Sequence, residues 1–174
     1  MSKRFLACVV SATFLLVLGC QATPLSHFTD NMFEGDQQLK AGQYSTALAS
    51  FLKANTFHPS SGAYAFAAMA AYKMNDIPLA DNYLVQATEG LTPNAVVTCI
   101  IYGYRSLVRF SQGNVPAGRD ELTNYIAAYR NVVPGSPTLR EVEFMAMAPQ
   151  VDTFALQKLI DQQIQQLPID YDKM

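Results

Sequence analysis

Side chains suited to catalysis or metal binding are scarce in this sequence of 174 residues. It contains two histidines, His27 and His58, three cysteines and no tryptophan. Histidine can act as a general base or metal ligand, and cysteine as a nucleophile, metal ligand or disulfide partner. No paired-cysteine spacing, phosphate-binding glycine loop, serine elbow or histidine–glutamate helix motif accompanies them. We therefore expect no enzymatic activity, no cofactor, no metal site and no small-molecule substrate.

Cys20 ends a segment typical of a secretory signal. Two basic residues at positions 3 and 4 precede an apolar run over residues 5–18, which is shorter than the roughly 20 residues of a membrane-spanning helix. The stretch Leu16–Cys20 resembles the bacterial lipobox, in which a small residue precedes a cysteine that is lipidated and becomes the new N-terminus. By this resemblance residues 1–19 are a lipoprotein signal peptide and Cys20 is the lipidation site. The alternative is an ordinary signal peptide with an incidental cysteine.

Residues 20–29 are expected to form a lipidated tether, because the stretch from Gln21 to His27 is polar and uncharged. In bacterial lipoproteins an aspartate after the lipidated cysteine tends to retain the protein at the inner membrane, and Gln21 stands in that place. The resemblance therefore implies a protein held at the outer membrane by its lipid and facing the periplasm.

The charge of the chain argues against some partners. Loss of the signal would remove Lys3 and Arg4 and leave 10 basic residues against 14 acidic ones, a net charge of −4. No stretch gathers enough basic residues to neutralise a phosphate backbone, so nucleic acid is not expected to bind.

Cys99 would be the last free thiol after cleavage and lipidation, so no disulfide within the chain is expected. It lies in the apolar stretch Val96–Ile101, where burial raises the pKa of a thiol. We interpret it as a small core residue.

A repeat of about 33 residues runs through the middle of the chain. A small, large, small pattern ends near a proline in each of two units, and both units have a small residue upstream: Gly35, Ala47, Phe51, Ala54 and Pro59, then Ala68, Ala80, Leu84, Ala87 and Pro93. These residues resemble the tetratricopeptide repeat (TPR), a helix–turn–helix unit of about 34 residues with small residues where its helices touch. The turn of a third unit, Gly113–Gly118, has the same cap and proline as Asn75–Ala80.

The expected fold is all-α. Helices are predicted near 30–41, 44–57, 62–74, 77–89, 94–112 and 115–132, then from Ser136-Pro137 to about Ala148 and from Asp152 to Leu167. Residues 30–134 would form about three TPR-like units. Residues 135–174 would form a pair of capping helices, because a repeat stack exposes an apolar face at its end.

In a TPR stack the first helix of each unit lines a concave groove. By that resemblance the groove positions that would bind a partner include Asp36, Lys40, Met69, Tyr72, Lys73 and Tyr104. Such an apolar and aromatic lining suits an amphipathic helix or an extended peptide. Core packing between helices is the alternative interpretation of the tyrosines and the methionine.

The resemblance covers roughly Asp30 to Val132 and is to bacterial TPR lipoproteins. These include pilotin-type lipoproteins, lipoproteins of tight-adherence pilus systems, and an adaptor that brings proteases to cell-wall hydrolases. The resemblance implies a lipid-anchored periplasmic adaptor that binds proteins such as a secretin or pilus and secretion components. An adaptor for cell-wall hydrolases or proteases at the outer membrane is the alternative.

Overall fold

Helices joined by turns and short connections make up the part of the chain that the structure describes. This structure is a computed structural model, and it describes residues 23–89 and 91–174, where no strand occurs. Its helices are α2 Pro24–Lys40, α3 Tyr44–Phe57, α4 Ser61–Lys73, α5 Ile77–Gln86, α6 Ala95–Ser111, α7 Val115–Val132, α8 Leu139–Met147 and α9 Thr153–Ile164, followed by the 3₁₀ turn η1 Tyr171–Lys173. The prediction of an all-α fold is therefore confirmed for these residues.

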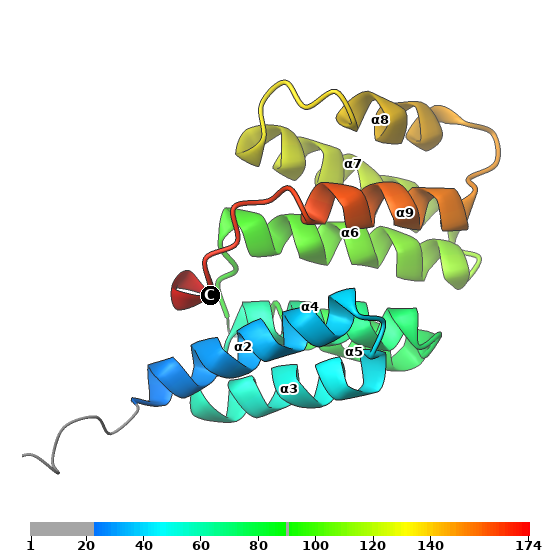
Figure 1. Ribbon diagram of the computed structural model, residues 1–174. Coiled ribbons are helices and arrows are strands. Elements are labelled where there is room, and N and C mark those ends of the chain that lie inside the picture. Colours follow the sequence, from blue (N-terminus) through cyan, green and yellow to red (C-terminus); the bar gives the residue numbers. More distant parts are fainter. Residues whose placement is uncertain (1–22, 90) are drawn as a thin grey trace, which may run out of the picture.

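The first six helices form three hairpins that stack in chain order (Figure 1). Helices α2 and α3, α4 and α5, and α6 and α7 pack in pairs, and the first helices of the pairs contact one another in turn. Helix α8 packs on α7 at the end of the stack, whereas α9 turns back and packs on α6. The prediction that the last two helices together cap the stack is therefore only half right.

Helix starts follow the capping residues that the sequence offers. Side chains at the N-cap accept hydrogen bonds from the first turn in six of the described α-helices, through Thr23, Ser60, Asp76, Asn94, Asn114 and Asp152. Prolines in the first turn of α5 and α7 stand where the missing N–H has no helical partner. The two matching turns before these helices also share a backbone with positive φ, at Asn75 and Gly113.

The first helix begins earlier than predicted. Thr23 caps α2 by accepting a hydrogen bond from the Ser26 N–H at 3.1 Å, and Pro24 occupies the first turn. Phe28 then lies fully buried against the core. Residues 24–29 are therefore helical and belong to the folded domain, and the tether predicted for 20–29 is wrong over this stretch.

The helix after α7 starts later than predicted. Ser136-Pro137 was expected to open it, but α8 begins at Leu139. The Ser136 and Thr138 hydroxyls lie 3.0 Å apart, so these residues bond each other within a turn. Leu139 and Val142, which begin α8, are the residues that pack into the core.

Small residues at the repeat positions lie where helices approach closely. A Cβ atom added to Gly35 would lie 2.5 Å from the Phe51 ring, and Gly118 faces Phe110 in the same way at 2.7 Å. Ala54 and Ala87 are fully buried, so both belong to the core; that helices cross at these positions stays a prediction. Cys99 is also fully buried, and desolvation raises the pKa of its thiol to about 12, as expected for a core residue.

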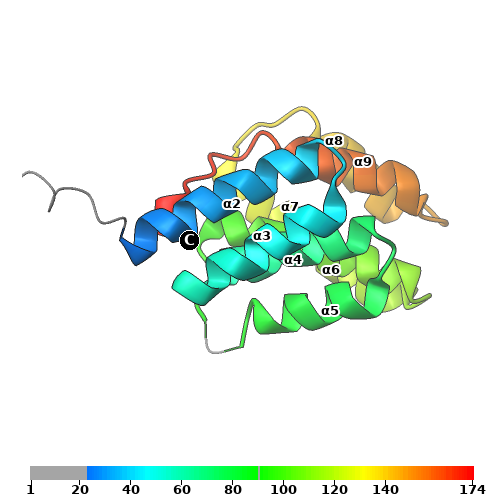
Figure 2. The same cartoon turned by 60° about the horizontal axis from the view of Figure 1, so that its bottom comes forward.

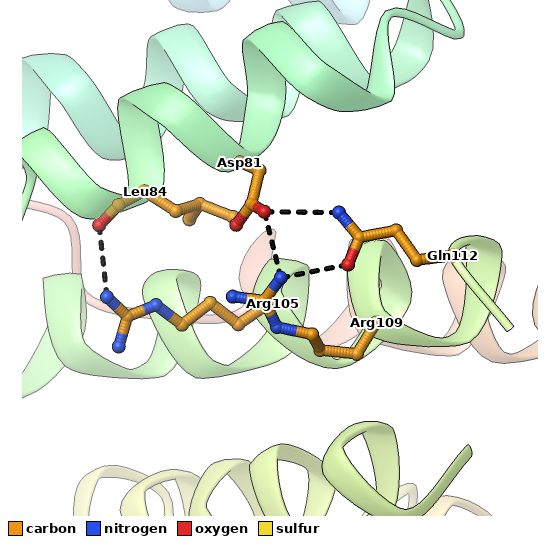
Figure 3. A network of polar contacts seen from close by, with 5 residues as sticks. All are labelled: Asp81, Leu84, Arg105, Arg109 and Gln112. Atoms are coloured by element: carbon orange, nitrogen blue, oxygen red, sulfur yellow. Dashed lines mark hydrogen bonds and ion pairs between the residues drawn. The ribbon is translucent and has the colours of Figure 1, made fainter. Parts of the chain in front are cut away.

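A polar network joins the second hairpin to the third (Figure 3). Arg109 of α6 donates to the Asp81 carboxylate of α5 at 2.8 Å, and Gln112 donates to the same oxygen at 3.1 Å. Arg105 donates to the Leu84 carbonyl at 3.3 Å, which adds a second link between the two helices. These hydrogen bonds link α5 to α6 at two places along the helices.

Candidate partner-binding surfaces

The first helices α2, α4 and α6 share one side, which we call the inner face. The chain itself covers much of this face, because α9 packs on α6 and η1 packs on α2. Figures 1 and 2 show the C-terminal segment running from α9 back to the first half of α2. The open groove expected from the sequence is therefore largely filled by residues 153–174.

Two of the six predicted groove residues are tyrosines that are buried within the chain's own packing. Tyr104 is fully buried and donates a hydrogen bond to Asp161 of α9. Tyr72 is also buried; its hydroxyl lies 3.1 Å from the Ser111 hydroxyl, and its ring meets the Tyr104 ring edge to face at 5.6 Å. Neither tyrosine is available to a partner in this conformation.

Burial also keeps these tyrosines neutral. Desolvation raises the pKa of Tyr104 well above its ordinary value, and the negative charge of Asp161 raises it further. The pKa of Tyr72 is raised mainly by burial. A neutral hydroxyl can still donate, so Tyr104 stays a hydrogen-bond donor to the Asp161 carboxylate.

The other four predicted groove residues, Asp36, Lys40, Met69 and Lys73, come together around one cavity of about 200 Å³ between α2, α4 and α9. Lys40 pairs with Asp36 at 2.5 Å, and Lys73 pairs with Asp161. Seven further residues complete the lining: Leu39, Tyr44, Phe66, Asp161, Ile164, Gln165 and Ile169. Both ammonium groups are already paired, and the lining mixes apolar side chains with polar and charged ones, so the cavity suits a side chain that has both an apolar part and a hydrogen-bonding group.

Residues of the C-terminal segment also cover part of the inner face, which no sequence pattern predicted. The Ser60 hydroxyl donates to the Met174 carbonyl at 2.8 Å, and Asn94 donates to the Lys173 carbonyl at 3.0 Å. Each contact joins residues at least 79 positions apart, so no local pattern could have predicted it.

A second surface lies on α8 and the start of α9. The side chains of Phe144, Met147 and Phe154 are 74%, 76% and 65% exposed. The buried positions of α9 are Leu156, Ile160, Gln163 and Ile164, so Phe154 lies outside the buried face of this helix. Large apolar side chains left in solvent are typical of protein interaction sites when they gather on one element.

Arg119 of α7 holds the turn between these two helices. Its guanidinium donates to the carbonyls of Ala146, Ala148 and Pro149. Because these carbonyls end α8 and follow it, the arginine fixes the α8–α9 turn against α7. The exposed apolar side chains of α8 and α9 therefore lie on either side of a turn that Arg119 holds.

The histidines, Cys20 and the predicted absence of a metal site concern other parts of the chain. His27 stacks on Phe57 with ring centroids 5.0 Å apart, and His58 meets Phe28 edge to face at 5.5 Å, so both histidines pack against rings. Cys20 lies outside the described residues. Within residues 23–89 and 91–174, no group of three potential metal ligands comes together, and no helix is long and apolar enough to cross a membrane.

The chain matches no family model, no curated protein and no solved structure.

Proposed function

We propose that the protein is a lipid-anchored, periplasm-facing adaptor of the TPR type that binds a protein partner in the assembly of an envelope machine, such as a pilus or secretion apparatus. The observation that carries this proposal is the exposure of Phe144, Met147 and Phe154 on α8 and α9. Exposed aromatic and methionine side chains are the types enriched in protein interfaces. The proposed docking surface is therefore the outer side of α8 and α9.

The position of this surface relative to the start of α2 supports an adaptor. In Figures 1 and 2 the turn between α8 and α9 and the first residue of α2 lie at opposite ends of the molecule. A lipid on Cys20, four residues before Pro24, would lie within about 14 Å of the helix start, since an extended residue spans at most ~3.6 Å. The membrane and the partner would then meet opposite ends of one rigid stack.

The TPR part of the proposal rests on the sequence repeat and on the hairpins. The 33-residue spacing of small residues coincides with two consecutive helix pairs, and Gly35 and Ala68 both lie buried on first helices. Pilus and secretion components are proposed as partners because the repeat and the lipobox together resemble lipoproteins of those systems.

The test is affinity capture from detergent extracts of the source envelope, with partners identified by mass spectrometry. We expect the wild-type chain to capture a secretin or a pilus component, and the double variant Phe144→Ser/Phe154→Ser to lose it. Circular dichroism melts should be unchanged, since both side chains lie mostly in solvent. Val85→Ser on α5 is the matched control, because Val85 is an exposed apolar residue away from this surface.

Each outcome decides something. Capture of the same partner by the double variant would remove the α8–α9 surface from the proposal. Capture of cell-wall hydrolases or proteases by the wild type, lost in the double variant, would replace the pilus or secretion role with the alternative adaptor role.

A further inference from the structure

The N-terminal ends of α4 and α6 bind the backbone of the chain's own last residues. At the start of α4, the Ser60 oxygen accepts from the Gly62 N–H at 3.0 Å, and its hydroxyl donates to the Met174 carbonyl at 2.8 Å. At the start of α6, Asn94 accepts from the Val97 N–H at 2.9 Å and donates to the Lys173 carbonyl at 3.0 Å. Each cap side chain thus bonds its own helix with one function and the C-terminal segment with the other.

Two side chains of this segment fit into seats on the same face. A Cβ atom on Gly62 would lie 2.8 Å from the Met174 side chain, so the absence of a side chain at Gly62 makes the seat for this methionine. The Tyr171 ring meets the Phe66 ring edge to face at 6.2 Å. Burial raises the pKa of Tyr171, and so does the nearby charge of Asp36, which keeps this hydroxyl neutral.

Asp172, which lies between Tyr171 and Met174 in the sequence, contacts α2. The Thr29 hydroxyl of α2 donates to the Asp172 carboxylate at 2.8 Å. Helix α4 therefore contacts the side chains of Tyr171 and Met174, and α2 contacts that of Asp172. The cap residues Ser60 and Asn94 bind the backbone carbonyls of Met174 and Lys173. We call these contacts together the segment site.

The segment is only partly buried, with exposed residues between the ones that pack on the core. Leu167 is buried and closes the packed part of α9, and the residues that follow it include the exposed Pro168, Asp170 and Asp172. The hydrogen bonds from Thr29 and Asn94 lie at exposed positions. Segments with few buried contacts and exposed hydrogen bonds open locally at a fraction of the global unfolding free energy.

We propose that residues 168–174 are an internal ligand that closes the segment site, and that a partner protein opens it by supplying a linear segment of the same chemistry. That segment has a tyrosine, an acidic residue directly after it, and a methionine three residues after the tyrosine. This inference concerns the inner face and does not depend on the α8–α9 surface.

The source of the incoming segment is another protein rather than a second copy. Leu167 is buried and follows α9, which is packed on α6, and residues 168–174 span at most about 25 Å from there. A second copy could donate its segment only by bringing its own inner face against this one.

The test is a binding titration on the full chain, followed by fluorescence anisotropy. The probe is a fluorescein-labelled peptide with the sequence of residues 167–174, and a scrambled peptide is the control. The internal segment competes with the probe, so the apparent affinity of the wild type is the intrinsic affinity multiplied by the fraction of open molecules. Tyr171→Ala removes an anchor of the internal ligand only, and it should tighten probe binding by about 30-fold, the usual effect of losing an interface aromatic.

Two further variants alter the site rather than the ligand. Gly62→Leu, placed in the Tyr171→Ala background, fills the methionine seat and should abolish probe binding. Thr29→Val removes the hydroxyl that donates to Asp172 and should weaken probe binding. Helix α2, which contains Thr29, should stay folded in this variant. Circular dichroism of each variant confirms that it is folded, and Met174→Ala serves as a second releasing variant.

Equal probe binding by wild type and both releasing variants would overturn the proposal, as would unchanged binding after Gly62→Leu and Thr29→Val. A wild-type dimer in size-exclusion chromatography that becomes monomeric in Tyr171→Ala would assign the segment to a second copy instead. Because the probe experiment uses neither the lipid nor the α8–α9 surface, its failure leaves the proposed adaptor function standing.

Discussion

Small residues at the repeat positions decide how closely the paired helices approach. Gly35 admits the Phe51 ring from the neighbouring helix, and Ala54 is fully buried three residues further along α3. Protein interiors are packed to the density of organic crystals, so an extra side chain at such a place has no free volume to enter. Small residues at these positions therefore allow α2 and α3 to pack closely.

Ala54→Leu is expected to lower the free energy of unfolding by roughly 1–3 kcal/mol, because it overpacks the space between helices. Ala49→Leu is the matched control, since Ala49 lies exposed on the same helix and should change stability little. Both values come from urea unfolding followed by circular dichroism. Equal stability of the two variants would show that position 54 is not at a helix crossing.

At this scale the sequence predicts burial better than it predicts what a buried residue contacts. The core positions of Ala54, Ala87 and Cys99 follow from their small size and apolar neighbours. Tyr72 and Tyr104 were placed correctly on first helices but expected to meet a partner, and they meet Ser111 and Asp161 instead. A tyrosine on a helix face has the same local pattern whether another protein or a distant helix covers it.

Helices and turns were largely predictable because their signals are local. The bounds of α3 and α7 agree with the predicted ranges 44–57 and 115–132, where caps and prolines mark the ends. The start of α2 was missed because the polar stretch before residue 30 lacks an obvious apolar stripe, although Thr23 and Pro24 form a cap and first turn. The path of α9 was missed because its amphipathic pattern shows that one face is buried but not which helix buries it.

Contacts between hairpins include a measurable electrostatic part. Arg109 and Asp81 join α6 to α5 and are both mostly shielded from solvent, whereas Arg130 and Glu143 join α7 to α8 with the arginine largely exposed. Shielding from water and salt strengthens an ion pair, and exposed pairs contribute little.

A double-mutant cycle is expected to give a coupling free energy of about 1 kcal/mol for Arg109→Ala with Asp81→Ala. The same cycle on Arg130 and Glu143 should give a coupling of only a few tenths of a kcal/mol, and it serves as the control. Unfolding in urea at low and high salt measures both. A coupling for the first pair no larger than for the second would mean that the network in Figure 3 does not hold the hairpins together.

On the scale of the whole molecule, the stack separates three activities that we propose for it. The anchor belongs to residues before α2, the docking surface to α8 and α9, and the segment site to the starts of α4 and α6. The sequence predicts the anchor at Cys20, but it does not predict the other two, since the docking surface is the exposed remainder of an amphipathic pattern and the segment site joins residues up to 143 positions apart. Sites that share no contacts respond to substitution independently, so each can be removed alone.

Cys20→Ser is expected to abolish lipidation and either to release the protein from the outer membrane or to trap it before it reaches that membrane, because the lipid is the proposed anchor. Radiolabelled fatty acid should appear on the wild-type chain and not on the variant, and fractionation should move the variant out of the outer membrane. The substitution lies outside the described helices, of which α2 begins at Pro24 with Thr23 as its cap, so the circular dichroism melt of the variant should equal that of the wild type. In detergent extract the variant should still capture the partner that Phe144→Ser/Phe154→Ser loses, whereas that double variant should still carry the fatty acid. Fatty acid on the Ser variant would refute Cys20 as the attachment site, and loss of capture together with the lipid would show that anchor and docking surface are not independent.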